Sequence, residues 1–354
     1  MRKGPSRTPD RPISRTWIAW ETQRRSLGLA PMLGAEIRLF LHKGWQRYPR
    51  CLADTAALLY KRPGNMVFVQ NPSMVLAAWA GALKGLLGYT LVVDRHSNFS
   101  HLSGPGAGLK RRLSDLLSDF TLRRADLTLV TNAELAESVE RAGGSAFVLP
   151  DPFPDLSAWR PLAEAVEAKP RAIKEILFVS SWAFDEPIEA ALEACRRLRG
   201  EVIVRITGRV PAGYARLLRS APDNFIATGF LSENDFFAAM AHCDAVMAVT
   251  RREATLVCGG YEGAAMGKPL ILGNSRALRE FFDAGCVYTD GGAADLEARI
   301  RDLMNGLPVY RSAIRAWLVR RENDQRDRLA ALEGVLSALN ARFLVRDGIV
   351  LVGG

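Results

Sequence analysis

Residues 249–272 read V-T-R-R-E-A-T-L-V-C-G-G-Y-E-G-A-A-M-G-K-P-L-I-L, and the rest of the chain is interpreted around them. The apolar run that leads into this stretch predicts a buried parallel strand. A polar loop follows, and Gly259 and Gly260 come directly before a predicted helix, Tyr261 to Met266. The sequence G-K-P then ends the helix and opens a second apolar strand. The stretch therefore predicts strand, loop, helix and strand, as in an α/β fold.

A helix that begins after two glycines favours the binding of an anion. Its first N–H groups and the positive end of its dipole point at whatever lies before it. Gly259 and Gly260 allow a ligand to approach the backbone closely. Glu262, in the first turn of the predicted helix, suits hydrogen bonds from ribose hydroxyls. The alternative is that Glu262 only complements the dipole and that the glycines only make a turn.

The segment E-G-A-A-M-G-K-P-L-I, residues 262–271, resembles the E-A-M-A-x-G-x-P-V-I segment of glycosyltransferase family 4. Members of that family have the GT-B fold, in which two Rossmann-like domains face each other across a cleft. Their segment binds a nucleotide-sugar donor and its Glu contacts the ribose, so the resemblance implies this role for Glu262. The family's second Glu would fall on Ala254. Glu253 lies one position earlier and takes that part only if the loop holds one extra residue.

The composition is that of a globular protein. The 354 residues are 48 % hydrophobic and 24 % charged, which suits two α/β domains with tails. We find neither a signal peptide nor an apolar run long enough to span a membrane. Five scattered cysteines form no C-x-x-C pair, so we expect a reducing cytoplasm.

The net charge of +9 is unevenly placed. Residues 1–150 hold 21 Lys and Arg against 11 Asp and Glu, so the basic excess lies in the N-terminal half. This asymmetry suggests an anionic partner there: nucleic acid, an acidic membrane surface or a phosphorylated acceptor. Nucleic acid ranks last because the sequence has neither a recognition helix nor a zinc motif.

The predicted domain organisation has four parts. Residues 1–15 form a disordered basic tail, because they are rich in Arg, Pro and Ser and lack an apolar period. Residues 16–155 form an N-terminal Rossmann-like acceptor domain, and residues 156–320 a C-terminal Rossmann-like donor domain. Residues 321–354 form C-terminal helices and a tail. The resemblance to GT-B proteins implies that these helices return to the first domain.

Residues 42–62 interleave aromatic and basic side chains around an apolar set. Such a segment suits a membrane interface, with rings at headgroup depth and cations on phosphates. The alternative, which we favour for the helix itself, is an amphipathic surface helix with a solvated charged face.

Two strands in the N-terminal half end in polar residues. The first runs into Asn71-Pro72, and the second into Asp94-Arg95-His96. The carboxyl edge of an open parallel sheet is where ligands bind. His96 is therefore a candidate site residue, with a structural His as the alternative, while Asp94 could instead cap a helix. The other three histidines (His42, His101 and His242) have no such context and are expected to be surface or structural residues.

The pair V-F-V-Q-N-P and L-V-V-D-R-H-S-N resembles a pattern in chitobiosyldiphosphodolichol beta-mannosyltransferases, in which the two strand ends flank the cleft. This resemblance implies that His96 touches the sugar or the acceptor, and that Asp94 acts as a base or orients the His. The same resemblance places Asn71 among the residues that line the cleft on the acceptor side. Arg24 and Arg25 are similar to basic residues after the first strand of those enzymes.

The second domain departs from the family in one loop. After the strand at residues 175–180, family members carry an Arg and a Lys that hold the donor diphosphate, but this chain reads S-S-W-A-F-D-E-P. The cations would then come from Arg209, Arg251 or Arg252, which follow other strand ends. Arg suits phosphate because it binds in bidentate geometry.

Two further donor residues are expected from neighbouring motifs. Gly208 precedes Arg209 at the end of a predicted strand. Phe230 lies in F-I-A-T-G-F-L-S-E-N-D-F, which resembles the family segment that receives the nucleotide base. The alternative for Phe230 is a core residue.

The resemblance implies transfer of a sugar from a nucleotide-sugar donor to an acceptor hydroxyl. Glu262 would contact the ribose, while Gly259, Gly260, Arg251 and Arg252 would contact the diphosphate. The catalytic candidates are His96, Asp94 and Glu253. No cofactor or metal is expected, because the sequence shows neither a D-x-D motif at a strand end nor a His/Cys cluster with metal spacing. Family 4 retains the anomeric configuration and the mannosyltransferases invert it, so both outcomes stay open.

The basic first domain suits a glycan or lipid-linked acceptor at the cytoplasmic face of the membrane, as in bacterial cell-surface polysaccharide synthesis. Two other functions stay open. One is a nucleotide-sugar-binding but inactive partner subunit, because the expected cations are missing from their loop. The other is a nucleotide-sugar epimerase of the same fold, for which the additional carboxylates and histidines were not found.

Overall fold

Apolar runs in both halves of the chain form parallel strands, and these build two separate sheets. The computed structural model describes residues 14–61, 66–71, 74–96, 108–169 and 171–346. The predicted tail at residues 1–15 lies almost wholly outside them. Two units divide the chain: unit 1 comprises Met1–Pro152 and Gln325–Gly354, and unit 2 comprises Phe153–Asp324.

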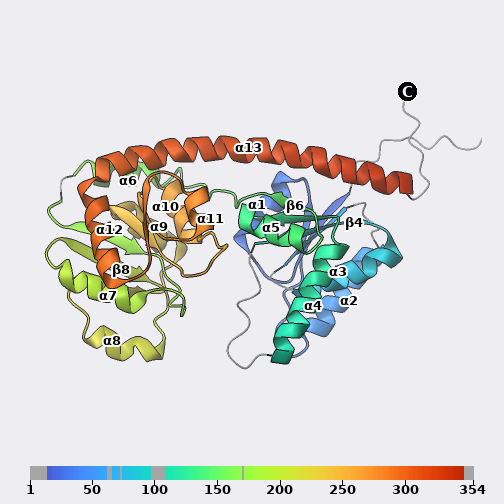
Figure 1. Cartoon of the computed structure of the whole chain (residues 1–354), viewed down its shortest axis with the longest axis horizontal. Helices are drawn as coiled ribbons and strands as arrows, with labels where there is room; N and C mark the ends of the chain where they lie inside the picture. The colour runs from blue at the N-terminus through green and yellow to red at the C-terminus, as the bar shows by residue number, and fades with distance from the viewer. Residues whose placement is uncertain (1–13, 62–65, 72–73, 97–107, 170, 347–354) are drawn as a thin grey trace, which may run out of the picture. The chain divides into compact units, whose positions relative to one another are not determined.

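Unit 1 contains a six-stranded sheet in the order β2-β1-β3-β4-β5-β6, in which all described neighbours are parallel (Figure 1). Its strands are β1 (Arg15–Ala19), β2 (Glu36–Leu39), β3 (Met66–Gln70), β4 (Thr90–Arg95), β5 (Leu127–Val130) and β6 (Ala146–Val148). Both faces of its central strands are apolar: Trp17 and Phe68 stack on one face, and Ile18 and Val67 belong to the core on the other. Burial on both faces explains why these strands read as continuous apolar runs.

Helices cover both faces of the first sheet. They are α1 (Arg24–Met32), α2 (Arg47–Lys61), α3 (Met74–Leu87), α4 (Gly108–Arg124) and α5 (Ala133–Arg141). Helices α2, α3 and α4 lie together (Figure 1), and α2 and α3 contribute Cys51, Leu59, Leu76 and Ala80 to the core on one face. Helix α1 contributes Leu29 and Ala30 to the core on the other face.

Unit 2 repeats the design with the order β12-β11-β10-β7-β8-β9, again with parallel neighbours. Its strands are β7 (Lys174–Phe178), β8 (Val202–Thr207), β9 (Phe225–Gly229), β10 (Ala245–Ala248), β11 (Leu270–Gly273) and β12 (Cys286–Thr289). Its helices are α6 (Arg160–Glu167), α7 (Ile188–Arg197), η2 (Ala212–Tyr214), α8 (Ala215–Arg219), α9 (Glu233–His242), α10 (Cys258–Ala265), α11 (Arg276–Phe281) and α12 (Ala293–Asn305). Helices α7 and α12 pack on one face, and α9, α10 and α11 on the other.

The last helix, α13 (Leu307–Arg346), contributes to the cores of both units. Ile314 and Trp317 belong to the second core of unit 2, and Leu332 and Leu336 belong to the core of unit 1. The fold prediction is confirmed: two parallel α/β sheets with interleaved helices, and a C-terminal helix whose last part groups with the first unit.

No helix in the described part of the chain is both long enough and apolar enough to cross a membrane.

Candidate functional site

In unit 2, the strands are added on one side of β7 first and on its other side from β10 onward. From β7 the chain moves outward through β8 and β9, and then returns to the other side of β7 to form β10. The loops after β7 and β10 therefore leave the sheet in opposite directions. Ligands of open parallel sheets bind at such a point. The predicted donor loop, residues 249–257, is one of these two loops.

Asp185, in the loop after β7, holds the loop after β10. Thr250 Oγ1 donates to Asp185 Oδ2, and the Arg251 N–H donates to the Asp185 carbonyl at 3.0 Å. Arg252 Nη2 lies 2.9 Å from Asp185 Oδ1. That contact is an ion pair without hydrogen-bond alignment, since among the described residues neither Asp185 Oδ1 nor Arg252 Nε has an aligned partner. Asp185 thus positions Arg252, and some N–H groups of the Arg252 guanidinium remain for another acceptor.

Glu186 closes the loop after β7 on itself. Its carboxylate accepts from Ser180 Oγ at 2.5 Å and from Ser181 Oγ at 2.9 Å. It also accepts from the Ser181 N–H at 3.1 Å and the Ala183 N–H at 3.3 Å. The loop that lacks the family's cations is therefore ordered by two carboxylates, Asp185 and Glu186. No motif in the sequence indicated a role for either residue.

Backbone strain is concentrated in these two loops. Trp182 after β7 has φ 61° and Ala254 after β10 has φ 52°, and no other non-glycine residue in the described part of the chain has a positive φ. The left-handed region costs an L-residue roughly 1–2 kcal/mol. Such strain persists where the surrounding structure fixes it, and it clusters at functional sites. Both strained residues are buried, and the Trp182 indole N–H donates to the Thr207 carbonyl at 2.8 Å.

Helix α10 begins earlier than the sequence pattern predicts. It starts at Cys258, so Gly259 and Gly260 lie inside its first turn rather than ahead of it. A Cβ at Gly259 would lie 2.8 Å from Val179 Cβ, and one at Gly260 would lie 2.9 Å from Phe282. The interpretation of the glycines as a turn ahead of the helix is therefore wrong: they lie in the helix and let it pack closely on its neighbours. Their expected part in diphosphate binding stays a prediction for their backbone N–H groups.

Glu262 is the fifth residue of α10, so its predicted place in the first turn is wrong. The helix dipole acts on charges within its first turn, which leaves little for Glu262 to complement. The residue is nonetheless only 6 % exposed. Because burial of a carboxylate is costly, this position is better explained by a specific hydrogen-bonding role than by a helix-end effect.

The other predicted donor residues of unit 2 lie at the same carboxyl edge. Arg251, Glu253 and Arg209 are exposed loop residues, and Phe230 is 78 % exposed directly after β9. The core alternative for Phe230 is therefore wrong. Phe184, which was not predicted, is 80 % exposed and lies under the Arg252 guanidinium at 5.7 Å.

Gly208 follows β8 with φ 96°, and a Cβ there would lie 2.3 Å from the Ser180 carbonyl oxygen. Only glycine allows the loops after β7 and β8 to approach this closely. Its placement next to the strained loop is consistent with a structural part in the predicted donor site.

In unit 1, the predicted site residues meet at the carboxyl edge of β3 and β4. Arg25 Nε donates to Asp94 Oδ1 at 2.7 Å, and Arg25 Nη1 donates to Asp151 Oδ1 at 2.6 Å. Burial lowers the pKa of Arg25, but Asp94 and Asp151 more than offset it, so the pKa is raised above its ordinary value. Asp94 is fully buried on this guanidinium. A carboxylate bound in this way orients its strand end, and the geometry does not favour its predicted role as a base.

Several polar atoms around this ion pair lack hydrogen-bond partners among the described residues. The side chains of Gln70 and Asn71 are buried, and neither amide is satisfied at its oxygen or its nitrogen. The buried atoms Asp94 Oδ2 and His96 Nδ1 also lack a hydrogen-bond partner among the described residues. The Asn71 N–H donates to the Asp94 carbonyl at 2.9 Å, which places the two strand ends side by side. Unsatisfied buried polar groups are rare and call for an explanation such as a ligand or bound water.

The remaining predicted residues of unit 1 are less informative. Arg24 is exposed at the start of α1. His42 contacts Asp54 at 2.6 Å, and His242 Nδ1 contacts the Ala238 carbonyl at 2.8 Å, as expected for structural or surface histidines. His101 and the Ser97-Asn98 pair lie outside the described residues. Within those residues, His, Cys, Asp and Glu form no group that could hold a metal ion.

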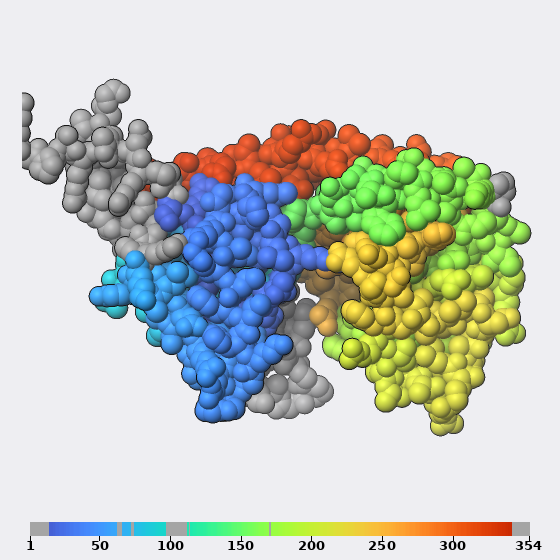
Figure 2. Space-filling view, turned by 180° about the vertical axis from the view of Figure 1, so that it is seen from behind, coloured from blue at the N-terminus to red at the C-terminus, as the bar shows by residue number. Residues whose placement is uncertain are grey.

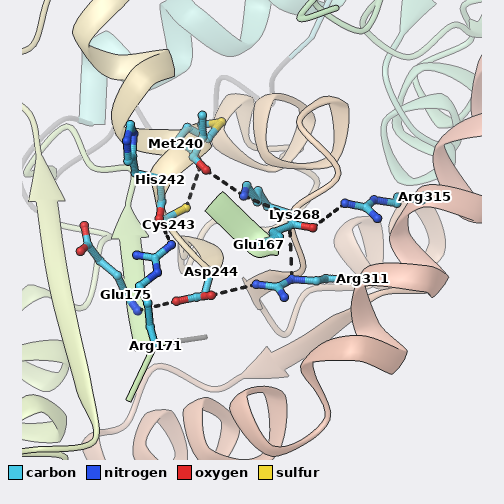
Figure 3. A network of polar contacts seen from close by, with 11 residues as sticks. Glu167, Arg171, Glu175, Met240, His242, Cys243, Asp244, Lys268, Arg311 and Arg315 are labelled. Carbon is cyan, nitrogen blue, oxygen red and sulfur yellow. Dashed lines mark hydrogen bonds and ion pairs between the residues drawn. The ribbon is translucent and has the colours of Figure 1, made fainter. Parts of the chain in front are cut away.

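A polar network that the sequence did not predict lies at the opposite, amino edge of the unit 2 sheet (Figure 3). Lys268 is fully buried, and its Nζ donates to Glu167 Oε1 at 3.1 Å and to the Ala241 carbonyl at 3.0 Å. Arg315 Nη2 donates to Glu167 Oε2 at 2.6 Å. Lys268 is the lysine of G-K-P, which was interpreted only as a helix end.

The same network continues through Asp244, directly before β10. Arg311 Nη2 donates to Asp244 Oδ1 at 2.8 Å, and the Glu175 N–H donates to Asp244 Oδ2 at 3.0 Å (Figure 3). It ties α6, the starts of β7, β10 and β11, and the first turns of α13 together. Because it lies at the amino ends of the strands, away from the carboxyl edge, we interpret it as a structural element of unit 2.

Comparisons with known proteins find a family model for part of unit 2. Residues 173–306 match the family model described as glycosyl transferases group 1. The matched segment contains the loops after β7 and β10 and the whole of α10. No curated protein sequence matches the chain.

Solved structures share the fold over nearly the whole chain. Anabaena Alr3699/HepE in complex with UDP aligns with a TM-score of 0.69 at 12 % identity, covering 92 % of this chain and 100 % of that one. Sucrose-phosphate synthase from Thermosynechococcus elongatus gives 0.67 at 12 % identity, with 94 % and 99 % covered. A UDP-N-acetylglucosamine 2-epimerase gives 0.57 at 13 % identity, with 85 % and 90 % covered. The chain thus has the fold of GT-B glycosyltransferases, and its residues 173–306 match glycosyl transferases group 1.

Proposed function

We propose that the protein is a glycosyltransferase that moves a sugar from a nucleotide-diphosphate sugar to an acceptor hydroxyl. The observation that carries this proposal is the group 1 match across residues 173–306, because it falls on the strained loops and on α10. The Anabaena protein of the same fold is seen with UDP and with UDP-glucose, which supports a nucleotide-sugar donor.

The donor diphosphate would lie at the amino end of α10. The first N–H groups of the helix and the guanidinium groups of Arg251 and Arg252 supply positive charge for the leaving group. Arg252 stays positioned by Asp185 while its unaligned donors turn to phosphate oxygens. Glu262 would accept from the ribose, and the exposed rings of Phe184 and Phe230 would stack on the base. Because these groups come from the chain itself, we expect transfer to persist in the presence of EDTA.

The acceptor would bind at the carboxyl edge of unit 1. The free amides of Gln70 and Asn71 offer both donors and acceptors, which suits the hydroxyl groups of a sugar. The ion pairs of Arg25 with Asp94 and Asp151 leave the cluster with a net negative charge, so a phosphate would be disfavoured there. We therefore propose a glycan acceptor, as in bacterial polysaccharide synthesis, with His96 near the reacting groups.

The five cysteines offer a direct test of the donor site. None of the five forms a disulfide, as a reducing cytoplasm allows, and only Cys258, at the start of α10, is exposed. Burial raises the pKa of the thiols of Cys195, Cys243 and Cys286 to about 12, about 12 and about 11, and makes them unreactive. We expect a maleimide to label Cys258 first, and UDP or another nucleoside diphosphate to protect it.

The control for this labelling experiment is Cys258→Ser, which should lose the rapid phase altogether. Unchanged labelling at saturating concentrations of uridine, guanosine and thymidine diphosphates would contradict a donor site at α10. Nucleotide-sugar hydrolysis or transfer is then measured with the unlabelled protein.

One observation favours a second candidate, a nucleotide-sugar-binding but inactive partner subunit. The loop after β7 lacks cations, and Asp185 partly neutralises Arg252. Such a subunit would show nucleotide protection of Cys258 without hydrolysing or transferring any sugar. The measured turnover therefore separates the two candidates.

We also propose that the enzyme works at the cytoplasmic face of a membrane, where a lipid-linked glycan would be presented. The basic N-terminal half supports this location, since anionic lipids attract such a charge. Recovery of the full-length protein with anionic vesicles at low salt, and its release at high salt, is the expected result.

A further inference from the structure

We propose that the outward face of α2, together with the turn before it, docks on an anionic phospholipid surface. We name this surface the aromatic face, and it consists of Lys43, Trp45, Tyr48, Arg50, Ala53, Ala57, Tyr60 and Lys61. It gives the membrane association proposed above a location, and it rests on that proposal but not on the transfer chemistry.

The orientation of α2 separates a core side from a solvent side. Cys51 and Leu59 on the inner side are buried against the sheet of unit 1, where α2 lies at the surface (Figure 2, blue). Arg50, Ala53, Ala57 and Tyr60 are exposed, and their spacing places them along one outward stripe of the helix. This stripe carries two alanines and a tyrosine beside Arg50, so the solvent side of α2 combines exposed cations with apolar and aromatic side chains.

Large aromatic rings stand at both ends of the stripe. Trp45, in the turn before α2, is 85 % exposed, and Tyr60, near the end of α2, is 77 % exposed. Single exposed apolar residues are ordinary on a protein surface. Two amphipathic rings of this kind at the ends of one outward helix face are typical of the headgroup region of a membrane.

The charges on the aromatic face are complementary to anionic lipids. Lys43, Arg50 and Lys61 are exposed beside the rings. In α2, every residue of which is described, the single acid is Asp54, and it contacts His42 at 2.6 Å. Glu21, from the loop after β1, is paired with Arg47 at 2.6 Å. The acids nearest in sequence and contact are thus engaged, and the cations of the face are available for phosphates.

A lipid surface fits these residues better than nucleic acid does. Binding to nucleic acid depends mainly on many phosphate contacts from Lys and Arg. Here only three cations accompany two exposed alanines and the aromatic rings, which matches a shallow insertion of rings with electrostatic attraction around it. Each cation near such a surface strengthens binding by about fivefold at low salt.

The test is co-sedimentation of the full-length protein with phosphatidylcholine vesicles, with and without about 30 mol % phosphatidylserine. We expect binding to the anionic vesicles and little to the neutral ones. The double variant Trp45→Ala/Tyr60→Ala should weaken binding about tenfold or more, because the rings no longer insert. The variant Arg50→Glu/Lys61→Glu should abolish most of the binding and flatten its salt dependence.

The matched control is Arg216→Glu/Arg219→Glu, which reverses two exposed cations on α8 and should leave vesicle binding within about twofold. Thermal unfolding should show that all variants remain folded, since the substituted side chains are on the surface. Turnover of the donor with a water-soluble acceptor should be unchanged in the α2 variants, which separates loss of docking from loss of activity. Equal vesicle binding by wild type and the α2 variants would overturn the proposal. So would binding of the aromatic face to duplex DNA but not to vesicles.

Discussion

The two edges of the unit 2 sheet are built in opposite ways. At the amino edge, the carboxylates of Glu167 and Asp244 each have at least two partners, and Lys268 is fully buried among them (Figure 3). At the carboxyl edge, the backbone is strained at Trp182 and Ala254 and aromatic rings stand exposed. A parallel sheet can thus concentrate its stability at one end and its ligand chemistry at the other.

The largest effect is expected from breaking the amino edge. Lys268→Met removes the buried ammonium and leaves Glu167 with less compensation, so the free energy of unfolding should fall by about 3 kcal/mol. Urea unfolding of the full-length chain measures this decrease in the free energy of unfolding. Arg315→Met, which removes a half-exposed partner of the same carboxylate, should cost less than about 1 kcal/mol. Equal effects of the two substitutions would show that burial does not govern this network.

Next comes Glu262 at the carboxyl edge. Glu262→Ala should lower kcat/KM for the nucleotide sugar by about 100-fold, because the proposed ribose hydrogen bonds are lost, and this corresponds to about 2.7 kcal/mol. Steady-state kinetics with the wild type as reference provide the measurement. Glu262→Gln, which keeps the size and one acceptor, should retain more activity than the Ala variant. If both variants keep full kcat/KM, Glu262 has no part in donor binding.

A smaller effect is expected at Phe230. Phe230→Ala should raise KM for the donor by about 5- to 30-fold, because a stacking contact with a base contributes roughly 1–2 kcal/mol. The unfolding free energy should stay within about 0.5 kcal/mol of wild type, as for other exposed positions. Titration with a nucleoside diphosphate, monitored by thermal shift, checks this, and Val309→Ala on α13 serves as an exposed control. A large loss of stability would instead return Phe230 to a packing role.

The smallest change is expected from relieving strain. Ala254→Gly should raise the free energy of unfolding by about 0.5–1 kcal/mol, because glycine adopts a positive φ without steric cost. Ala264→Gly, at an ordinary helical position in α10, should instead lower it by about 1 kcal/mol. Opposite signs in the same assay would confirm that the carboxyl edge stores strain, and equal signs would refute it.

The strands were the most predictable part of the molecule. Runs such as residues 66–69 and 91–93 are continuously apolar, and a strand buried on both faces leaves little choice of position. The start of α10 was less predictable, because two adjacent glycines suggest a turn when their packing partners are unknown. In the structure Val179 and Phe282 occupy the space that a side chain at these positions would need.

Candidate residues were predicted by position, but their partners were not. Asp94 and Arg25 are 69 positions apart, so no local pattern reveals that they form an ion pair. Lys268 was missed because a lysine between Gly and Pro ordinarily indicates the end of a helix. The composition of residues 42–62 suggested either a membrane interface or a solvated surface helix, and only the packing of Cys51 and Leu59 shows which side chains of α2 face outward.

The close approach of α10 to its sheet has an evolutionary consequence. A Cβ at Gly263 would lie 2.7 Å from Leu270 and 2.9 Å from Val246, so even an added methyl group would force the helix or the sheet to shift. Substitutions at this contact between α10 and the sheet are therefore a poor route to a new substrate preference. New donor preferences would have to arise in the neighbouring loops, whose residues can vary without displacing the helix.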